Sequence, residues 1–236
     1  MSSAHGSWPS PLTSADLAAA GVRIDGARFA ADGIWWSESV PQERGRMRVL
    51  RTAPDGTVHE VLPAPWSARS RVHEYGGGAW TVSDDGTLFF VDGDDQRGRR
   101  WDPEAVAPVP LTPSGAQHGG LRLQQGRLFA VREDLRPDPH VRAIVEIPVD
   151  GSGAEDDEAV RVIVSHGGFY AHPALSPDGS RLAYVVWPDT RMPWDAALAC
   201  VVDLVSGADG AIPSRAALQP EWVSDDELLF ADDATG

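Results

Sequence analysis

A tight turn followed by an apolar strand occurs five times in this chain. The clearest copy, "PALSPDGSRLAYVVW" from Pro173, places the turn at 176–179 and ends its strand at Trp187. In that turn proline fixes φ, aspartate can bond nearby backbone amides, and glycine tolerates positive φ. Apolar residues occupy both alternating sets of the strand, so both of its faces must be covered.

The looser copies are "ARFAADGIWWSES", "AWTVSDDGTLFFVDGDD", "LRLQQGRLFAVRED" and "PEWVSDDELLFADD", which begin at Ala27, Ala79, Leu121 and Pro220. Aligned on their turns, the five copies lie 53, 40, 53 and 48 residues apart. Propeller blades repeat about every 40–50 residues, and neighbouring blades cover one another's faces. We therefore expect an all-β chain that forms a β-propeller, with about four complete four-stranded blades and a partial fifth. A β-sandwich whose hairpins share turn residues is the alternative.

The chain divides into an N-terminal segment, 1–26, and a partial propeller domain, 27–236. Within the first, "PLTSADLAAAG" predicts a short helix with Ser14 as N-cap and Gly21 just past its end. No basic segment followed by an apolar core marks a signal peptide, and no run approaches the roughly 18 apolar residues of a membrane helix. The single cysteine, Cys200, has apolar neighbours that place it in the core. We expect a cytoplasmic protein with no membrane partner.

The charge balance excludes several functions. The net charge is −15, all 20 basic residues are arginine, and the chain has no lysine and no asparagine. A lysine-containing phosphate loop, a Schiff-base lysine and an N-glycosylation site are therefore impossible. Acidic clusters at 92–95 and 155–158 would repel nucleic acid, so no nucleic-acid partner is expected.

Three motifs resemble catalytic or metal sites without completing them. "HEYGG" at 73–77 lacks the second histidine of a zinc-protease helix, and "DGDDQRG" from Asp92 lacks the glycine and final glutamate of a calcium loop. "HGG" at 118–120 and 166–168 resembles an oxyanion loop, but the chain contains no G-x-S-x-G nucleophile elbow. We expect no catalytic residue, no metal and no cofactor within this chain.

Two segments exceed what the repeats require: "SRVHEYGGGAW" at 70–80 and "WPDTRMPWDAAL" at 187–198. One precedes the first strand of the second repeat and the other follows the second strand of the fourth, so antiparallel strands place both at one end of the propeller. The substrate-cavity candidates in these segments are Arg71, His73, Glu74, Tyr75, Arg191 and Trp194. The alternative is that Trp187 and Trp194 fill gaps between blades.

Both segments resemble stretches in the N-terminal propeller of the prolyl oligopeptidase family, in its dipeptidyl aminopeptidase/acylaminoacyl peptidase branch. The "SPDG-x-LAY" start of the fourth repeat is similar too, although many other propellers share it. The resemblance covers essentially the whole chain. It implies a serine peptidase in which a propeller, usually of seven or eight blades, caps a C-terminal α/β-hydrolase domain that carries Ser, Asp and His. On this basis the chain holds an incomplete ring and lacks the hydrolase domain with all three catalytic residues.

The function implied is that of a non-catalytic propeller part which gates and shapes the cavity of a peptidase that hydrolyses short peptides. Its partners would be a short peptide and the hydrolase domain. Arginine and tryptophan could hold peptide carbonyls and apolar side chains, and Glu74 could meet an amino terminus. Two alternatives stay open: a free-standing propeller that binds a protein partner, and a propeller hydrolase of another type, such as a lactonase or glycosidase.

Overall fold

The structure is a computed structural model that describes residues 6, 11–13, 15, 21–30, 33–136 and 140–233. Most of the helix predicted between Ser14 and Gly21 lies outside these residues. None of the helices in the part of the chain so described is long and apolar enough to cross a membrane.

Five antiparallel sheets follow one another along the chain, and we number them as blades 1 to 5. Blade 1 comprises β1 (Ile24–Ala30), β2 (Gly33–Val40), β3 (Arg46–Thr52) and β4 (Val58–Glu60). Blade 2 comprises β5 (Trp80–Val82), β6 (Leu88–Val91), β7 (Gly98–Trp101) and β8 (Val109–Pro110). Blade 3 comprises β9 (Gln117–Gln124), β10 (Arg127–Asp134), β11 (Val141–Ile147) and β12 (Arg161–Val164). Blade 4 comprises β13 (Phe169–Leu175), β14 (Arg181–Trp187), β15 (Leu198–Asp203) and β16 (Asp209–Ile212), and blade 5 has β17 (Leu218–Trp222) and β18 (Leu228–Ala231).

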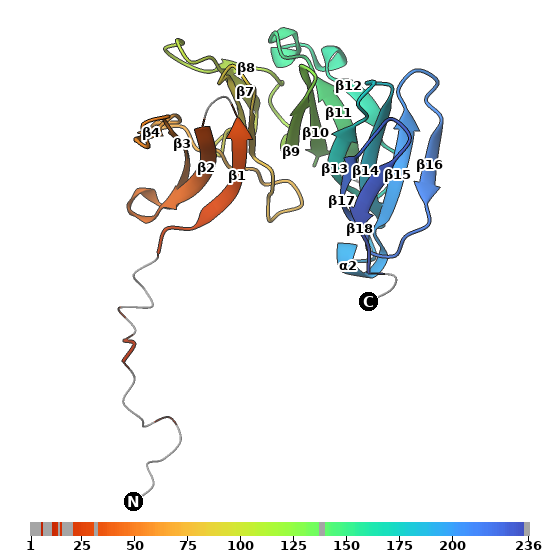
Figure 1. Cartoon of the computed structure of the whole chain (residues 1–236), viewed down its shortest axis with the longest axis horizontal. Helices are drawn as coiled ribbons and strands as arrows, with labels where there is room; N and C mark the ends of the chain where they lie inside the picture. Colours follow the sequence, from red (N-terminus) through yellow and green to blue (C-terminus); the bar gives the residue numbers. More distant parts are fainter. Residues whose placement is uncertain are drawn as a thin grey trace, which may run out of the picture.

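The predicted fold, four complete blades and a partial fifth of a β-propeller, is confirmed. Each of the five repeated stretches contributes to the first two strands of one blade, and in blades 2 to 5 these strands are joined at the turn on which the repeats align. Figure 1 shows the blades side by side around an arc, from β1–β4 at one end to β17–β18 at the other. The short helices lie in loops: η1 (Pro41–Glu43), η2 (Ser152–Ala154), η3 (Asp157–Ala159) and α2 (Pro193–Ala196).

The core lies between blades, which explains why the strands are apolar on both faces. In β10, Phe129 and Val131 join a cluster shared with blade 4, while Leu128 and Ala130 join a cluster shared with blade 2. The same alternation occurs in β6 and β14, because successive side chains of a strand point to opposite faces.

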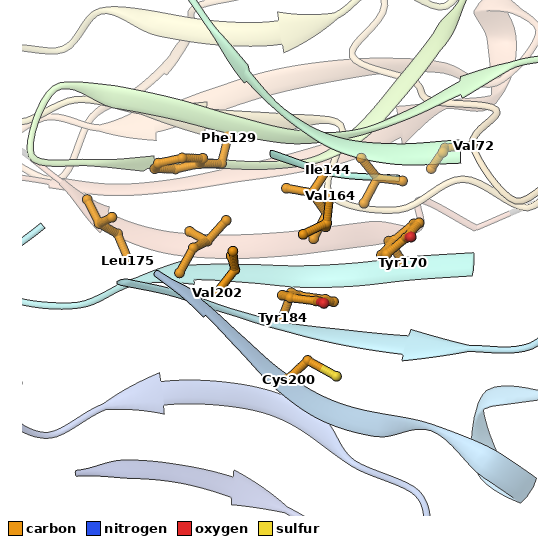
Figure 2. Packing of buried hydrophobic residues seen from close by; sticks show 11 residues of the cluster. Val72, Phe129, Ile144, Val164, Tyr170, Leu175, Tyr184, Cys200 and Val202 are labelled. Carbon is orange, nitrogen blue, oxygen red and sulfur yellow. The ribbon is translucent and has the colours of Figure 1, made fainter. Parts of the chain in front are cut away.

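Figure 2 shows the largest of these clusters, between blades 3 and 4. Phe129 and Ile144 contribute from blade 3, and Tyr184 and Cys200 from blade 4. Cys200 is buried, as its apolar neighbours in the sequence predict. Val72 also belongs to this cluster, although it precedes blade 2 in the sequence. The segment that carries it therefore leaves its own blade.

Each blade has a residue with left-handed backbone at or just before its first strand. These residues are Gly26, Gly78, Gly120, His172 and Gln219, with φ between 53° and 71°. In blades 1, 3, 4 and 5 the pairing register shifts at this point, which marks a β-bulge. First strands of successive blades contact one another in the pairs β5–β9, β9–β13 and β13–β17. The bulges therefore repeat at one level of the propeller, where the blades converge.

Candidate functional site

A cavity of about 310 Å³ lies where first strands from several blades meet the segment before blade 2. Its wall includes His73, Tyr75, Gly76, Gly77, Gly78, Arg122, His172 and Trp187. Residues of the 70–80 and 187–198 segments thus share one cavity. Both segments therefore lie at the same end of the propeller, as the strand directions predict.

The first of these segments is held against β9 of blade 3. The Ser70 hydroxyl donates to the His118 carbonyl at 2.6 Å. Farther along, the backbone N–H of Gly120 donates to the Gly77 carbonyl at 2.9 Å, and that of Leu121 to the Gly78 carbonyl at 2.8 Å. Residues 70–78 therefore cross from blade 2 over blade 3 and reach blade 4.

This close approach requires the glycines on both sides. A Cβ on Gly78 would lie 2.7 Å from the Gly120 Cα, and Gly78 has a φ of +54°. A Cβ on Gly76 would overlap the Ser70 carbonyl oxygen, and one on Gly119 would overlap the Val72 side chain. The glycine run at 76–78 and the "HGG" at 118–120 are therefore complementary packing surfaces.

Glu133, at the end of β10, links the two segments through a polar network. Its carboxylate accepts the His73 backbone N–H at 2.7 Å and the Arg142 Nε–H at 2.7 Å. The Arg142 Nη1 in turn donates to Asp189 Oδ1 at 2.9 Å, at the start of the second loop. The Glu133 side chain is only 3% exposed, so its charge depends on these donors. Through this network, side chains of blade 3 hold the two segments next to each other.

Sequence reasoning missed Glu133 and Arg142, although the sequence contained a signal. Glu133 continues the alternating set of Phe129 and Val131, which faces blade 4. A charged residue in such a set must find partners, because burying an unpaired carboxylate is costly. That position could therefore have been singled out as part of a buried polar network.

Aromatic rings surround His73. Ring centroids lie 5.7 Å away for Tyr75, 5.5 Å for Phe169 and 5.3 Å for Trp187. Arg142 places its guanidinium carbon 3.9 Å from the Phe169 centroid, a cation–π contact. Burial lowers the pKa of His73 in spite of the opposing effect of the Glu133 carboxylate. The His73 Nε2 atom is buried and has no hydrogen-bond partner among the described residues, in keeping with a neutral imidazole.

The structure separates the candidates of the first segment. His73 and Tyr75 line the cavity, and Tyr75 is 70% exposed. Arg71 turns elsewhere, donating from Nη2 to the Gly93 carbonyl at 2.7 Å in a second, polar cavity. Glu74 is exposed, with a left-handed φ of 67°, and is not among the cavity-lining residues.

Trp187 and Pro193 line the cavity from the second segment. Trp187 is also 5% exposed in the cluster between blades 4 and 5, so it fills a gap between blades as well. Trp194, which is 64% exposed, fills no such gap. Arg191 is exposed, and neither it nor Trp194 is among the residues that line the cavity.

No group of three or more His, Cys, Asp or Glu side chains that could hold a metal ion occurs within residues 21–30, 33–136 and 140–233. What the cavity offers instead is a set of rings and exposed backbone. The N–H groups of Gly77 and Gly78 donate to no acceptor within the part of the chain that the structure describes. Both glycines are exposed and line the cavity, so they can donate to a bound carbonyl.

No protein-family model and no curated protein matches this chain. Among solved structures, a puromycin-hydrolyzing peptidase of Mycobacterium tuberculosis is 37% identical with a TM-score of 0.87, over 98% of this chain and 38% of that one. A puromycin hydrolase complexed with PGG is 31% identical with a TM-score of 0.85, over 97% of this chain and 38% of that one. A structure from a study of two prolyl endopeptidases, 12% identical with a TM-score of 0.61 over 90% and 33% of the chains, shares the fold. The chain thus spans less than two fifths of the length of these relatives.

Proposed function

We propose that the cavity at His73 and Trp187 forms the propeller wall of a peptide-binding site. The premise is that this chain belongs to the prolyl oligopeptidase family and corresponds to its β-propeller part. The bound peptide would be short and would be hydrolysed by a neighbouring α/β-hydrolase domain that supplies Ser, Asp and His. In this role the propeller gates and shapes the substrate cavity. A cytoplasmic location remains part of the proposal.

The observation that carries this proposal is the pairing of aromatic rings with unpartnered backbone donors in one cavity. Peptides present apolar side chains and carbonyl oxygens together, and recognition of both needs a ring surface beside N–H groups. Tyr75 and Trp187 supply the rings, and Gly77 and Gly78 supply the donors. The similar structures are a puromycin-hydrolyzing peptidase and a puromycin hydrolase, which supports a peptide as the ligand class.

Each side chain has a separate role in this proposal. Tyr75, which is largely exposed, would pack on an apolar side chain of the peptide. His73, half-buried and neutral, would keep the rings in place rather than exchange protons. Arg71, Glu74, Arg191 and Trp194 lie outside the cavity wall, so any contact of theirs with a peptide would be made at its rim.

The test is the binding of the tripeptide Ala-Phe-Ala to the chain, measured by calorimetry. We expect Tyr75→Ala to weaken binding about fivefold, because an exposed ring contact contributes on the order of 1 kcal/mol. The matched control is Phe29→Ala, which removes an aromatic ring that is 88% exposed and lies outside this cavity. Absence of binding at millimolar peptide, or equal weakening by both variants, would contradict the proposal.

A further inference from the structure

Four charged or titratable side chains converge beside the peptide cavity. Arg28 comes from β1, Arg122 from β9, His172 from β13 and Glu221 from β17. Together they line a third cavity, of about 460 Å³, which is distinct from the polar cavity at Arg71. Arg28, Arg122 and His172 line both this cavity and the peptide cavity, so the two spaces adjoin.

The position of these residues repeats from blade to blade. Arg28, Arg122 and Glu221 each stand two residues after a left-handed residue of a first strand. In blade 4 the left-handed residue is His172 itself, with a φ of +54°. A left-handed backbone is costly for a residue other than glycine, so the fold holds it there against local strain. The cluster is therefore built into the bulges.

The positive charges in the cluster exceed the negative ones. Arg122 Nη2 lies 2.6 Å from Glu221 Oε2, and this pair is neutral as a whole. The side chain of Arg28 stacks over Trp80, 5.6 Å from its ring centroid, and donates to the Trp80 carbonyl at 3.5 Å. Within the described residues no carboxylate forms an ion pair with Arg28. One guanidinium charge therefore lacks a counter-ion.

The surroundings of the Arg28 guanidinium leave its positive charge poorly balanced. Burial and the neighbouring Arg122 guanidinium lower the pKa of Arg28, and the opposing effect of the Glu221 carboxylate is smaller. Burial and Arg122 also lower the pKa of His172, so its imidazole adds no charge at neutral pH. This local excess of positive charge lies in a chain whose net charge is −15. A ligand anion would supply the missing partner.

We propose that Arg28 and Arg122 bind a carboxylate of the peptide that occupies the adjoining cavity. Guanidinium groups suit this ligand, because their planar N–H donors match the two oxygens of a carboxylate. The inference rests on the proposed function, since the peptide brings the carboxylate into reach. The carboxylate is either the C-terminus of a short peptide or an acidic side chain.

The test compares three tripeptides by calorimetry on the whole chain: Ala-Phe-Ala, its C-terminal amide, and Ala-Phe-Glu amide. We expect the free acid to bind about tenfold more tightly than its amide at low salt, because a hydrogen bond to a charged group is worth more than a neutral one. Arg28→Gln should remove most of that ratio. The control Arg161→Gln, on β12, should keep it, since Arg161 lines neither cavity.

A second variant is expected to raise the preference for the free acid instead of lowering it. The proposal can therefore still be tested if Arg28→Gln fails to fold. Glu221→Gln removes the carboxylate that competes for Arg122, so it should increase the preference for the free acid severalfold. Tight binding of Ala-Phe-Glu amide would identify a side-chain carboxylate, and weak binding would identify the C-terminus. Equal affinities for acid and amide in every variant would overturn the carboxylate site and leave the proposed function standing. If neither peptide binds, both are overturned.

Discussion

The imidazole of His73 lies 5.3 Å from the indole of Trp187, centroid to centroid, with the ring planes 65° apart. One residue precedes blade 2, and the other ends the second strand of blade 4. They meet because residues 70–78 follow β9 across blade 3. The cavity therefore depends on blade 3 as much as on the two segments that line it.

Gly78→Ala is expected to destabilise the protein by about 2 kcal/mol or more. The alanine would have to adopt a left-handed backbone, and its Cβ would lie 2.7 Å from the Gly120 Cα. Gly45→Ala is the matched control, because Gly45 has a φ of +76° and nothing within 4 Å of its Cβ position. The control should cost only about 1 kcal/mol, the penalty for the left-handed backbone alone. Equal losses in urea unfolding would show that contact with β9 is unimportant.

Glu133→Gln is expected to destabilise the protein by about 2 kcal/mol, because it leaves the Arg142 charge without its buried partner. The amide oxygen can still accept the His73 N–H, so the fold should persist. Exchange of the His73 amide hydrogen should accelerate, and Ala-Phe-Ala should bind less tightly. As a control, Glu155→Gln removes an ion-pair partner of Arg97 that is 89% exposed, and should change stability by less than about 0.5 kcal/mol. A Glu133 variant as stable as this control would contradict the prediction.

His118 should make the protein sensitive to acid. Burial lowers its pKa from 6.5 to about 4, and the orphaned Nε2 has no acceptor for a proton among the described residues. The folded state favours the neutral ring, so its stabilisation is complete above pH 6.5 and is lost as the pH falls toward 4. We expect His118→Gln to flatten the decline in unfolding free energy between pH 7 and 4.5 by on the order of 2 kcal/mol. The exposed His59, replaced by Gln, should leave the profile unchanged.

Cys200 should report global unfolding. It is 6% exposed, and burial raises the pKa of its thiol, so native protein should react with a thiol reagent at least about 100-fold more slowly than protein in urea. As the only cysteine of the chain, it gives an unambiguous signal. Rapid stoichiometric labelling under native conditions would mean that the interface between blades 3 and 4 opens locally.

Turn chemistry and apolar alternation were enough to predict the blades. The Ser176–Gly179 turn and its four looser copies predict where the first strand of each blade meets the second. Strands that are apolar on both faces must be covered on both sides, as neighbouring blades cover them here. The positions of the outer strands could not be predicted in this way, because β4 and β8 are short and largely exposed. Their pairing is determined by the neighbouring strand more than by their own residues.

The position of the candidate cavity could be predicted only in part, and its use as a substrate site stays a prediction. The strand directions placed both segments at one end, and His73 and Tyr75 do line the cavity. The sequence could not show that residues 70–78 leave their own blade, because this path depends on close backbone contact with β9. Arg71 turns away from the cavity for the same reason, since the crossing path directs its side chain toward Gly93. Long-range contacts of this kind leave no local pattern.

The alternation along β10 has a consequence for how substitutions combine. Leu128 and Phe129 are adjacent in the chain but pack into different interfaces, whereas Phe129 and Leu182 share one. In a double-mutant cycle, Phe129→Val should be coupled to Leu182→Val and close to additive with Leu128→Val. Energetic coupling then passes from blade to blade through shared interfaces, as between nearest neighbours in a one-dimensional array. The cooperative unit of stability in this protein is therefore the interface between two neighbouring sheets.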